Sequence, residues 1–152
     1  MKYDQIDTQR MLMDYKFYRP LYITLHFNNY VKFDRGERVR IRVKNNHKHF
    51  CNNLHRLTYK KSKKQLTRYF VIERGYGDGL HSHLLIDTPE HLSKSQFKQN
   101  ILNSWKRTRD GVSVFFEDAY NTQGLSGYNS KQQNSETTEI LDAEVDVSNS
   151  RN

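Results

Sequence analysis

The chain is poor in cysteine and has no long apolar run. Cys51 is the only cysteine among its 152 residues, so an internal disulfide framework is excluded and a reducing compartment is expected. No run of about eighteen apolar residues is present, so we expect no membrane span. Residues 1–18 lack the apolar centre of a secretory signal. The length of the chain predicts one domain, and we expect it to be cytoplasmic.

Negative charge is in the minority and is concentrated near the end of the chain. The formal net charge is +8, but residues 132–152 hold five acidic residues and one basic residue, which leaves +12 for residues 1–131. A body with this much positive charge is expected to bind a polyanion, and nucleic acid is the usual one. A solubilising surface and binding to acidic lipid are the alternatives that charge alone leaves open.

The hydrophobic pattern predicts both strands and helices. Runs rich in β-branched and aromatic residues predict four strands, over residues 21–29, 66–75, 80–87 and 111–118. Apolar residues at helical spacing predict two longer helices, over residues 43–63 and 92–108. In the first helix Phe50, Leu54 and Leu57 share a face, and in the second Ser93 and Gln96 make a capping box. This order predicts an α+β fold, with a central antiparallel sheet and helices packed on it.

The same pattern suggests where the folded domain ends. We assign residues 1–134 to it, with 1–20 of unclear structure and 119–134 partly helical. After that the chain is acidic and polar without clear periodicity, so residues 135–152 are predicted to be a disordered tail.

The strand "GLHSHLLID" (79–87) carries two histidines one residue apart. His81 and His83 project from the same face of a strand, because alternate side chains point the same way. Glu73 lies on the preceding strand, and antiparallel pairing across the "GYGDG" turn would bring it alongside both. Two imidazoles and one carboxylate suit a divalent ion with open coordination positions. A surface histidine pair and a solvated Glu73 beside Arg74 are the alternative interpretation.

The segment "GYNSKQ" (127–132) offers a nucleophile. Tyr128 and Lys131 are three residues apart and share a face if the segment is helical. A phenol is almost fully protonated at neutral pH, so a metal or a base is needed to promote its attack. Lys131 would then orient a phosphate or stabilise the developing charge.

The motifs in this order resemble the HUH endonuclease superfamily. A "YITLHF" strand, a carboxylate ahead of a His-x-His strand and a Tyr-x-x-Lys segment are similar to those of rolling-circle replication initiator (Rep) nuclease domains, over roughly residues 20–134. The resemblance implies a ferredoxin-type sandwich, like that of RNA-recognition domains. It also implies a metal held by Glu73, His81 and His83, with Mn²⁺ or Mg²⁺ as the cofactor and Zn²⁺ as a further option.

The resemblance further implies a reaction. Tyr128 would attack a phosphodiester in single-stranded DNA or an origin hairpin, forming a 5′-phosphotyrosine link and releasing a 3′-hydroxyl that primes replication of a plasmid or virus. Lys131 would be its helper. The chain has no G-x-x-x-x-G-K-[ST] motif, so a host helicase or polymerase is expected as a partner. The host cytoplasm is the expected compartment, with the nucleus as the alternative in a eukaryotic host.

Two features depart from the usual pattern. The residue between the histidines is ordinarily bulky and apolar, and here it is Ser82, which is expected to weaken packing in the core. Tyr120 precedes Tyr128 by eight residues, further than in two-tyrosine members, and is interpreted as structural.

Other functions remain open. The chain could be a relaxase or a single-tyrosine transposase of the same superfamily, although no third histidine stands near the pair in the sequence. It could be a non-catalytic single-strand binder that uses its aromatics, with Tyr30, Phe33, Tyr59, Tyr69 and Phe70 as candidates. It could also be a zinc hydrolase that uses water and needs no tyrosine.

Two basic segments are the candidates for DNA contact. They lie in "RGERVRIRVKNNHKH" (35–49) and "KKSKK" (60–64), and a generic solvated face is the alternative interpretation. The residues selected for DNA binding are Arg35, Arg38, Arg40, Lys44, Lys60, Lys61, Lys63 and Lys64.

Overall fold

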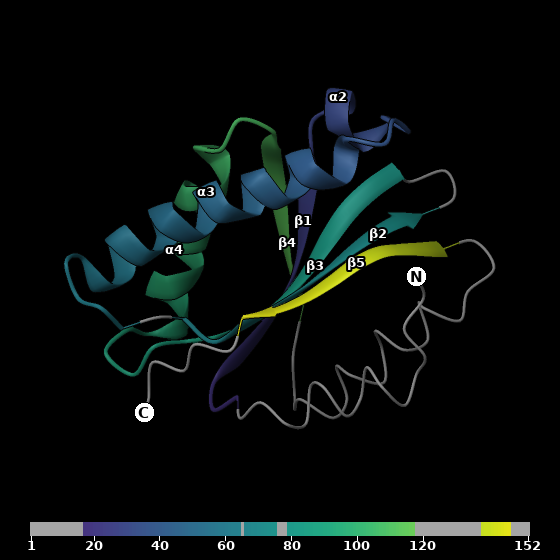
Figure 1. The fold of residues 1–152 in the computed structure, drawn as a ribbon. Coiled ribbons are helices and arrows are strands. Elements are labelled where there is room, and N and C mark those ends of the chain that lie inside the picture. The colour runs from purple at the N-terminus through teal and green to yellow at the C-terminus, as the bar shows by residue number, and fades with distance from the viewer. Residues whose placement is uncertain (1–16, 65, 76–78, 118–137, 147–152) are drawn as a thin grey trace.

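A single antiparallel sheet organises the chain, seen in a computed structural model that describes residues 17–64, 66–75, 79–117 and 138–146 (Figure 1). The strand order is β4-β1-β3-β2-β5. The strands are β1 (Pro20–Phe27), β2 (Arg68–Gly75), β3 (Gly79–Asp87), β4 (Gly111–Glu117) and β5 (Thr138–Asp146). The helices are α2 (Asn29–Lys32), α3 (Val39–Tyr59) and α4 (Lys94–Lys106). The predicted α+β class is confirmed.

The two long helices cover one face of the sheet (Figure 1). Alternation along β1 places Ile23 and Leu25 on this face, where both are fully buried. The core continues through the neighbouring strands and the two helices, with Phe70, Ile72, Leu84, Ile86, Phe50, Leu54, Phe97, Ile101 and Trp105. The opposite face of the sheet carries Thr24 of β1, Glu73 of β2, and His81 and His83 of β3.

Helix α4 forms where its sequence signals predict it. Ser93 Oγ accepts from the backbone N–H of Gln96, and the Gln96 side chain accepts from the N–H of Ser93, which completes the predicted capping box. Phe97, Ile101 and Trp105 are fully buried on one face. The indole Nε1 of Trp105 donates to the backbone carbonyl of His26 at 3.0 Å, so α4 is tied to the sheet by a hydrogen bond as well as by packing.

Helix α3 begins and ends earlier than its pattern predicts. It starts at Val39 instead of residue 43, and it stops at Tyr59 because Lys60 adopts a φ of 55°, which cannot continue a helix. Phe50 and Leu54, two of the three residues predicted to share a face, are buried, whereas the third, Leu57, is 40% exposed near the end of the helix. Thr58 takes the next buried position. Among the described residues, no helix has the length and hydropathy needed to cross a membrane.

The acidic end of the chain contributes a strand, so the prediction of disorder over 135–152 was wrong for residues 138–146. β5 pairs with β2 along its whole length, and one irregularity of register occurs between Ile72 and Glu73. The register sets Arg68 opposite Asp146 and Arg74 opposite Glu139. Sequence periodicity missed the strand because its polar residues outnumber its apolar ones.

The strand β5 should be needed for stability. Removing residues 138–152 is expected to expose the hydrogen-bonding edge of β2, which lowers the melting temperature and promotes association between chains. A loss of about 2 kcal/mol would correspond to roughly 4–8 °C. Thermal unfolding followed by circular dichroism measures this change, and light scattering detects the association.

The matched control for this truncation is removal of residues 147–152 alone, which leaves β5 intact. Equal melting temperatures for the two truncated chains would show that β5 does not support the sheet.

Candidate metal centre

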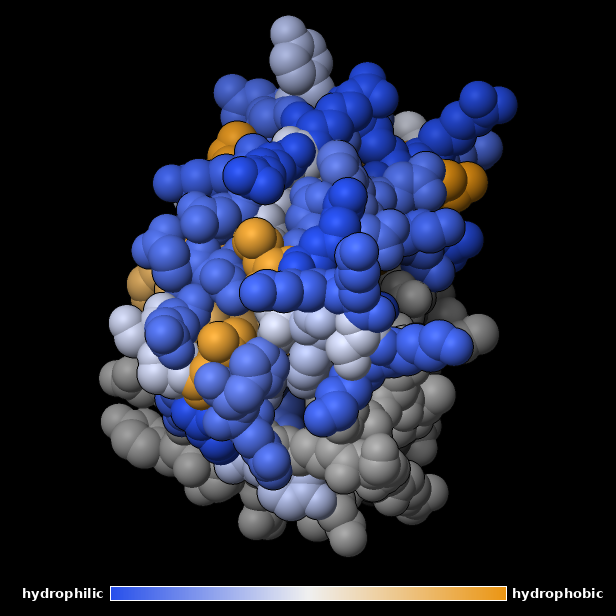
Figure 2. Space-filling view, turned by 90° about the vertical axis from the view of Figure 1, so that its left-hand side faces the viewer, coloured by the Kyte–Doolittle hydropathy of each residue, from blue (hydrophilic) through white to orange (hydrophobic). Residues whose placement is uncertain are grey.

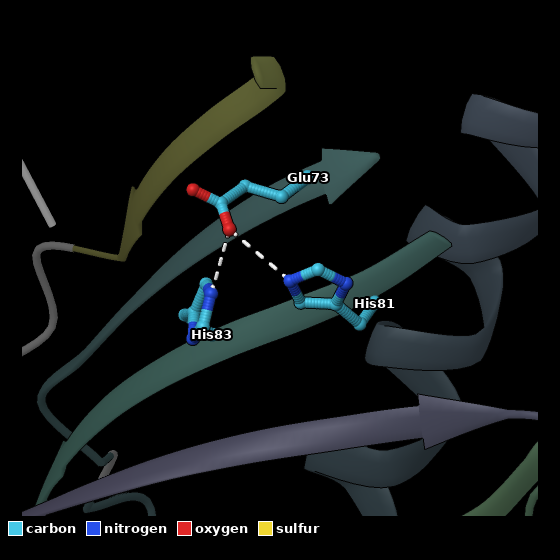
Figure 3. Close-up of side chains that lie close together, drawn as sticks. All are labelled: Glu73, His81 and His83. Carbon is cyan, nitrogen blue, oxygen red and sulfur yellow. Dashed lines mark hydrogen bonds and ion pairs between the residues drawn. The ribbon is translucent and has the colours of Figure 1, made fainter. Parts of the chain in front are cut away.

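Three side chains from β2 and β3 meet on the face of the sheet opposite to the helices (Figure 3). Glu73 is the cross-strand partner of His81, and His83 lies two residues further along the same face. Glu73 Oε2 is 3.1 Å from His81 Nε2 and 2.7 Å from His83 Nε2. The antiparallel pairing thus brings Glu73 to both histidines, as the sequence predicted.

The remaining ring nitrogens of the two histidines are held by neighbouring groups. His81 Nδ1 lies 3.3 Å from the carbonyl oxygen of Gly79. His83 Nδ1 lies 3.0 Å from the hydroxyl of Tyr22 and 3.4 Å from Oγ1 of Thr24. The Tyr22 ring is stacked on His83, with 5.6 Å between centroids. Such outer partners fix the orientation of a metal-binding histidine, and here both rings are held with Nε2 toward Glu73.

Both imidazoles direct Nε2 to the same oxygen of Glu73. Each Nε2 donates a hydrogen bond to the carboxylate when it carries a proton, and offers a lone pair to a metal ion when it does not.

The donor atoms fit a metal ion. One ligand atom from each of the three residues lies within 4.8 Å of the others. Ligands at about 2.1 Å from a four- or six-coordinate ion lie about 3.0–3.4 Å apart, close to the two separations measured here. Glu73 and His83 are buried, whereas 16% of the His81 side chain is exposed. The group could therefore hold a metal ion that is reached from the His81 side.

Charge at Glu73 is stabilised by the histidines. Burial on its own would raise the pKa of this carboxyl, but hydrogen bonds from His81 and His83 outweigh that effect and lower the pKa. Glu73 is therefore ionised at neutral pH, as a metal ligand must be. Glu117, a carboxyl at the end of β4 on the same face, has its pKa raised by burial and is not part of the three-residue group.

A third histidine, which sequence analysis did not select, lies beside the group. His26 is the cross-strand partner of His81 in the β1–β3 pair. The register of β1 with β4 shifts between Leu25 and Phe27, so His26 is at a bulge, a feature often found next to functional sites. Burial, then the positive charges of His81 and Lys32, lower its pKa. His26 and His81 are far apart in the sequence, and only strand pairing brings them together.

The opposite side of β3 carries a buried polar pair. Ser82 is fully buried among the helices, and its Oγ lies 2.8 Å from His47 Nε2. The His47 ring stacks on Phe70 with 4.1 Å between centroids. Burial, with the charges of Lys44 and Arg68, lowers the pKa of His47 to about 3, so this ring is neutral. The expectation that Ser82 weakens core packing overlooked this partner on α3.

The residues selected for DNA contact are all exposed, but they form two separate groups. Arg35, Arg38, Arg40 and Lys44 lie at or before the first turns of α3, and Lys60, Lys61, Lys63 and Lys64 follow its last residue. A helix of this length separates them by about 30 Å. Figure 1 shows that the start of α3 lies at the end of the sheet where β2 and β3 connect. The first group is therefore the one near the metal centre.

Each group borders a pocket of about 430 Å³. Arg38 lines the first with Arg42 and Arg109, but there Arg42 is paired with Asp110 at 2.7 Å. Lys63 lines the second with Arg68. Figure 2 shows one side of the molecule, on which the described surface is hydrophilic apart from separate apolar residues. A large apolar docking patch is not seen among the described residues of that side.

Tyr128 and Lys131, selected as nucleophile and helper, lie outside the described residues, as does Tyr120. Comparisons with models of protein families, with curated proteins and with solved structures found no match to this chain. The geometry of the three-residue group is therefore the main structural information on function.

The carboxylate should control metal uptake. Replacing Glu73 by Gln removes the only charged ligand of the group, so the affinity for Mn²⁺ is expected to fall by at least about tenfold. Isothermal titration calorimetry at neutral pH measures the affinity. In the unchanged protein the affinity should also fall as the pH is lowered, because protons compete for the two Nε2 atoms.

Glu117→Gln is the matched control, since it removes a carboxyl on the same face outside the group. Weaker Mn²⁺ binding in this variant and not in Glu73→Gln would assign the metal to different ligands.

The pair behind β3 should stabilise the fold. Ser82→Ala leaves both nitrogens of His47 without a partner among the described residues, because its Nδ1 already has none. The expected cost is about 1–3 kcal/mol. The double variant Ser82→Ala/His47→Phe should recover part of it, since an apolar pair leaves nothing unsatisfied. Urea unfolding of all three proteins measures this difference, and equal stability of the single and double variants would contradict it.

The same variants should differ in their response to pH. The pKa of His47 is about 3 in the folded chain against about 6.5 in an unfolded one. Below pH 6.5 the unfolded chain binds a proton at His47 that the folded chain does not bind, so the free energy of unfolding falls as the pH is lowered from 6.5 toward 3. Between pH 6.5 and pH 3 the free energy of unfolding should fall more steeply in the unchanged protein than in the double variant, by at most about 1.4 kcal/mol per pH unit.

Proposed function

We propose that the chain is a metal-dependent endonuclease and strand transferase of HUH type that nicks and joins single-stranded DNA. The observation that carries the proposal is the convergence of Glu73, His81 and His83 on adjacent antiparallel strands, with both Nε2 atoms directed at one carboxylate oxygen. The central sheet with helices on one face and the charge of +12 over residues 1–131 support it.

Mn²⁺ or Mg²⁺ is the proposed cofactor, with Zn²⁺ as a third option. One carboxylate and two imidazoles can bind each of these ions, with affinities that differ between them. A bound ion would polarise the scissile phosphate and neutralise charge that develops on it. Glu73, His81 and His83 would hold it, while Tyr22, Thr24 and the Gly79 carbonyl keep the two rings oriented.

Tyr128 is the proposed nucleophile and Lys131 its electrostatic helper. The phenolic oxygen forms a bond to phosphorus, and the bond from phosphorus to the 3′-oxygen breaks. The phenol proton is given up to solvent or a base, and the leaving 3′-oxygen takes a proton to become a hydroxyl. Attack by a later 3′-hydroxyl on the phosphotyrosine reverses the step and joins two DNA ends. The phosphotyrosine link replaces the phosphodiester without hydrolysis, so the enzyme can both nick a strand and close it again.

Rolling-circle replication of a plasmid or virus is the proposed role for this chemistry. The released 3′-hydroxyl would prime synthesis by a host polymerase, and a host helicase would open the duplex. An origin hairpin is the proposed substrate. The cytoplasm, or the nucleus of a eukaryotic host, is the proposed compartment.

A conjugative relaxase is the second candidate, and one observation favours it. His26 provides a third histidine beside His81, which the sequence did not suggest. It is second because His26 is outside the group of residues whose ligand atoms lie within 4.8 Å of one another.

Formation of a covalent adduct tests the proposal. Single-stranded hairpins of varied sequence, labelled at the 3′ end so that the label stays on the fragment joined to the tyrosine, are incubated with the protein and Mn²⁺, and the products are separated on a denaturing protein gel. The unchanged protein should give a labelled band that EDTA abolishes. Tyr128→Phe and His81→Ala should each reduce it by at least about a hundredfold, since nucleophile and metal are both required.

Tyr120→Phe is the matched control and should retain the adduct. A band that survives in Tyr128→Phe would assign the nucleophile to another residue. Cleavage without any adduct would favour a hydrolase that uses water.

A further inference from the structure

Helix α2 presents two aromatic rings to solvent. The side chains of Tyr30 and Phe33, at the helix and its C-cap, are 81% and 58% exposed, while Val31 between them is fully buried. Because Val31 faces the core, the rings of Tyr30 and Phe33 on either side of it face solvent. Single exposed aromatics are ordinary, but two in four residues, close to a candidate metal centre, are a feature that core packing does not explain.

The aromatic pair is surrounded by positive charge. Lys32 Nζ lies 5.4 Å from the centroid of the Phe33 ring. Arg35 and Arg38 follow in the next turn of chain and are exposed. Ring faces that stack on bases, beside cations that contact phosphates, are the combination that proteins use for single-stranded nucleic acid.

The short helix is held rigidly. Asn28 Oδ1 accepts from the N–H of Val31 and so caps α2. The same asparagine donates from Nδ2 to Asp110 Oδ1 at 3.1 Å and from its backbone N–H to the Asp110 carbonyl at 2.8 Å. Asp110 also accepts two hydrogen bonds from Arg42 on α3. The rings are therefore mounted on a preorganised element, as a binding surface requires.

Helix α2 lies at the metal-centre end of the sheet (Figure 1). Gly79, two residues before His81, packs so closely on Lys32 that an added Cβ would lie 2.6 Å from the Lys32 carbonyl oxygen. Tyr30 is also close to His26, the cross-strand partner of His81. It follows His26 by four residues, so their Cα atoms are at most about 14 Å apart. The rings are thus within reach of a short stretch of DNA whose phosphate lies at the metal centre.

We propose that Tyr30 and Phe33 form a stacking platform for bases of single-stranded DNA next to the scissile phosphate, with Lys32, Arg35 and Arg38 contacting the adjoining phosphates. The platform would hold the strand across the end of the sheet and direct it to Glu73, His81 and His83. This inference rests on the proposed function for its substrate. Single-stranded DNA is favoured over a protein partner because cations adjoin the rings and because paired bases would not offer their faces.

The test measures binding separately from cleavage. Fluorescence anisotropy with a labelled oligothymidine, in EDTA, reports affinity without the metal. Tyr30→Leu/Phe33→Leu keeps apolar bulk and removes both rings, and it is expected to weaken binding at least about tenfold, from the loss of two stacked bases. Both side chains are exposed, so the melting temperature should not change.

Tyr18→Leu is the matched control. Tyr18 is 56% exposed but lies before β1, at the other end of that strand and more than about 20 Å from α2. Its replacement should leave affinity unchanged. Affinity in the double variant equal to that of the unchanged protein would overturn the platform, as would an equal loss of binding to duplex DNA.

The two proposals can fail separately. If oligothymidine binding depends on Tyr30 and Phe33 but no Mn²⁺-dependent adduct forms, the platform stands and the nuclease is wrong. If the adduct forms and the double variant binds normally, the nuclease stands and the platform is wrong. With both correct, saturating DNA should restore adduct formation in the double variant but not in His81→Ala.

Discussion

The register between β2 and β3 is the constraint on which the site depends. It sets Glu73 opposite His81 and closes the hairpin with Gly75 opposite Gly79. A slip of one residue would turn both histidines into the core and bring Ser82 to the other face, because side chains alternate along a strand. Gly79 contributes through its φ of 75° and its close approach to Lys32, neither of which a larger residue would allow without strain.

The two faces of β3 specify this register together. On one face His81 and His83 need Glu73, and on the other Ser82 needs His47. A slipped pairing would leave all of these polar groups buried without partners, which costs far more than the loss of a few apolar contacts. The buried pair thus disfavours alternative strand pairings directly behind the candidate metal centre. Polar groups in a core can increase the uniqueness of a fold even when they add little to its stability.

The sequence predicted much of the fold because its signals are local. Runs rich in β-branched and aromatic residues identified β1 to β4, and the capping box with the apolar spacing identified α4. Those signals were insufficient where tertiary pairing decides the structure. β5 mixes apolar and acidic residues without a clear alternation and pairs with β2, a partner more than sixty residues earlier, so its sequence alone predicts disorder.

The candidate site divides in the same way. Glu73, His81 and His83 are close in sequence around one turn, so a hairpin argument places them together. His26 and His47 lie far in sequence from the residues of β3 that they contact, His81 and Ser82, and nothing in their neighbourhood distinguishes them from surface histidines. The sequence also could not show which of the aromatic residues proposed for stacking on bases are exposed and which are buried. Tyr69 and Phe70 are buried, and Tyr59 is partly buried beside His91, whereas Tyr30 and Phe33 are exposed.

The position of β5 has a consequence for the proposed nucleophile. β4 and β5 are the two edge strands of the sheet, so the chain between Glu117 and Thr138 begins at one edge and ends at the other. Tyr128 lies in the sequence between these two strands. The pairing of β4 with β1 and of β5 with β2 therefore anchors both ends of the segment that carries the proposed nucleophile, one at each edge of the sheet that holds the candidate metal centre.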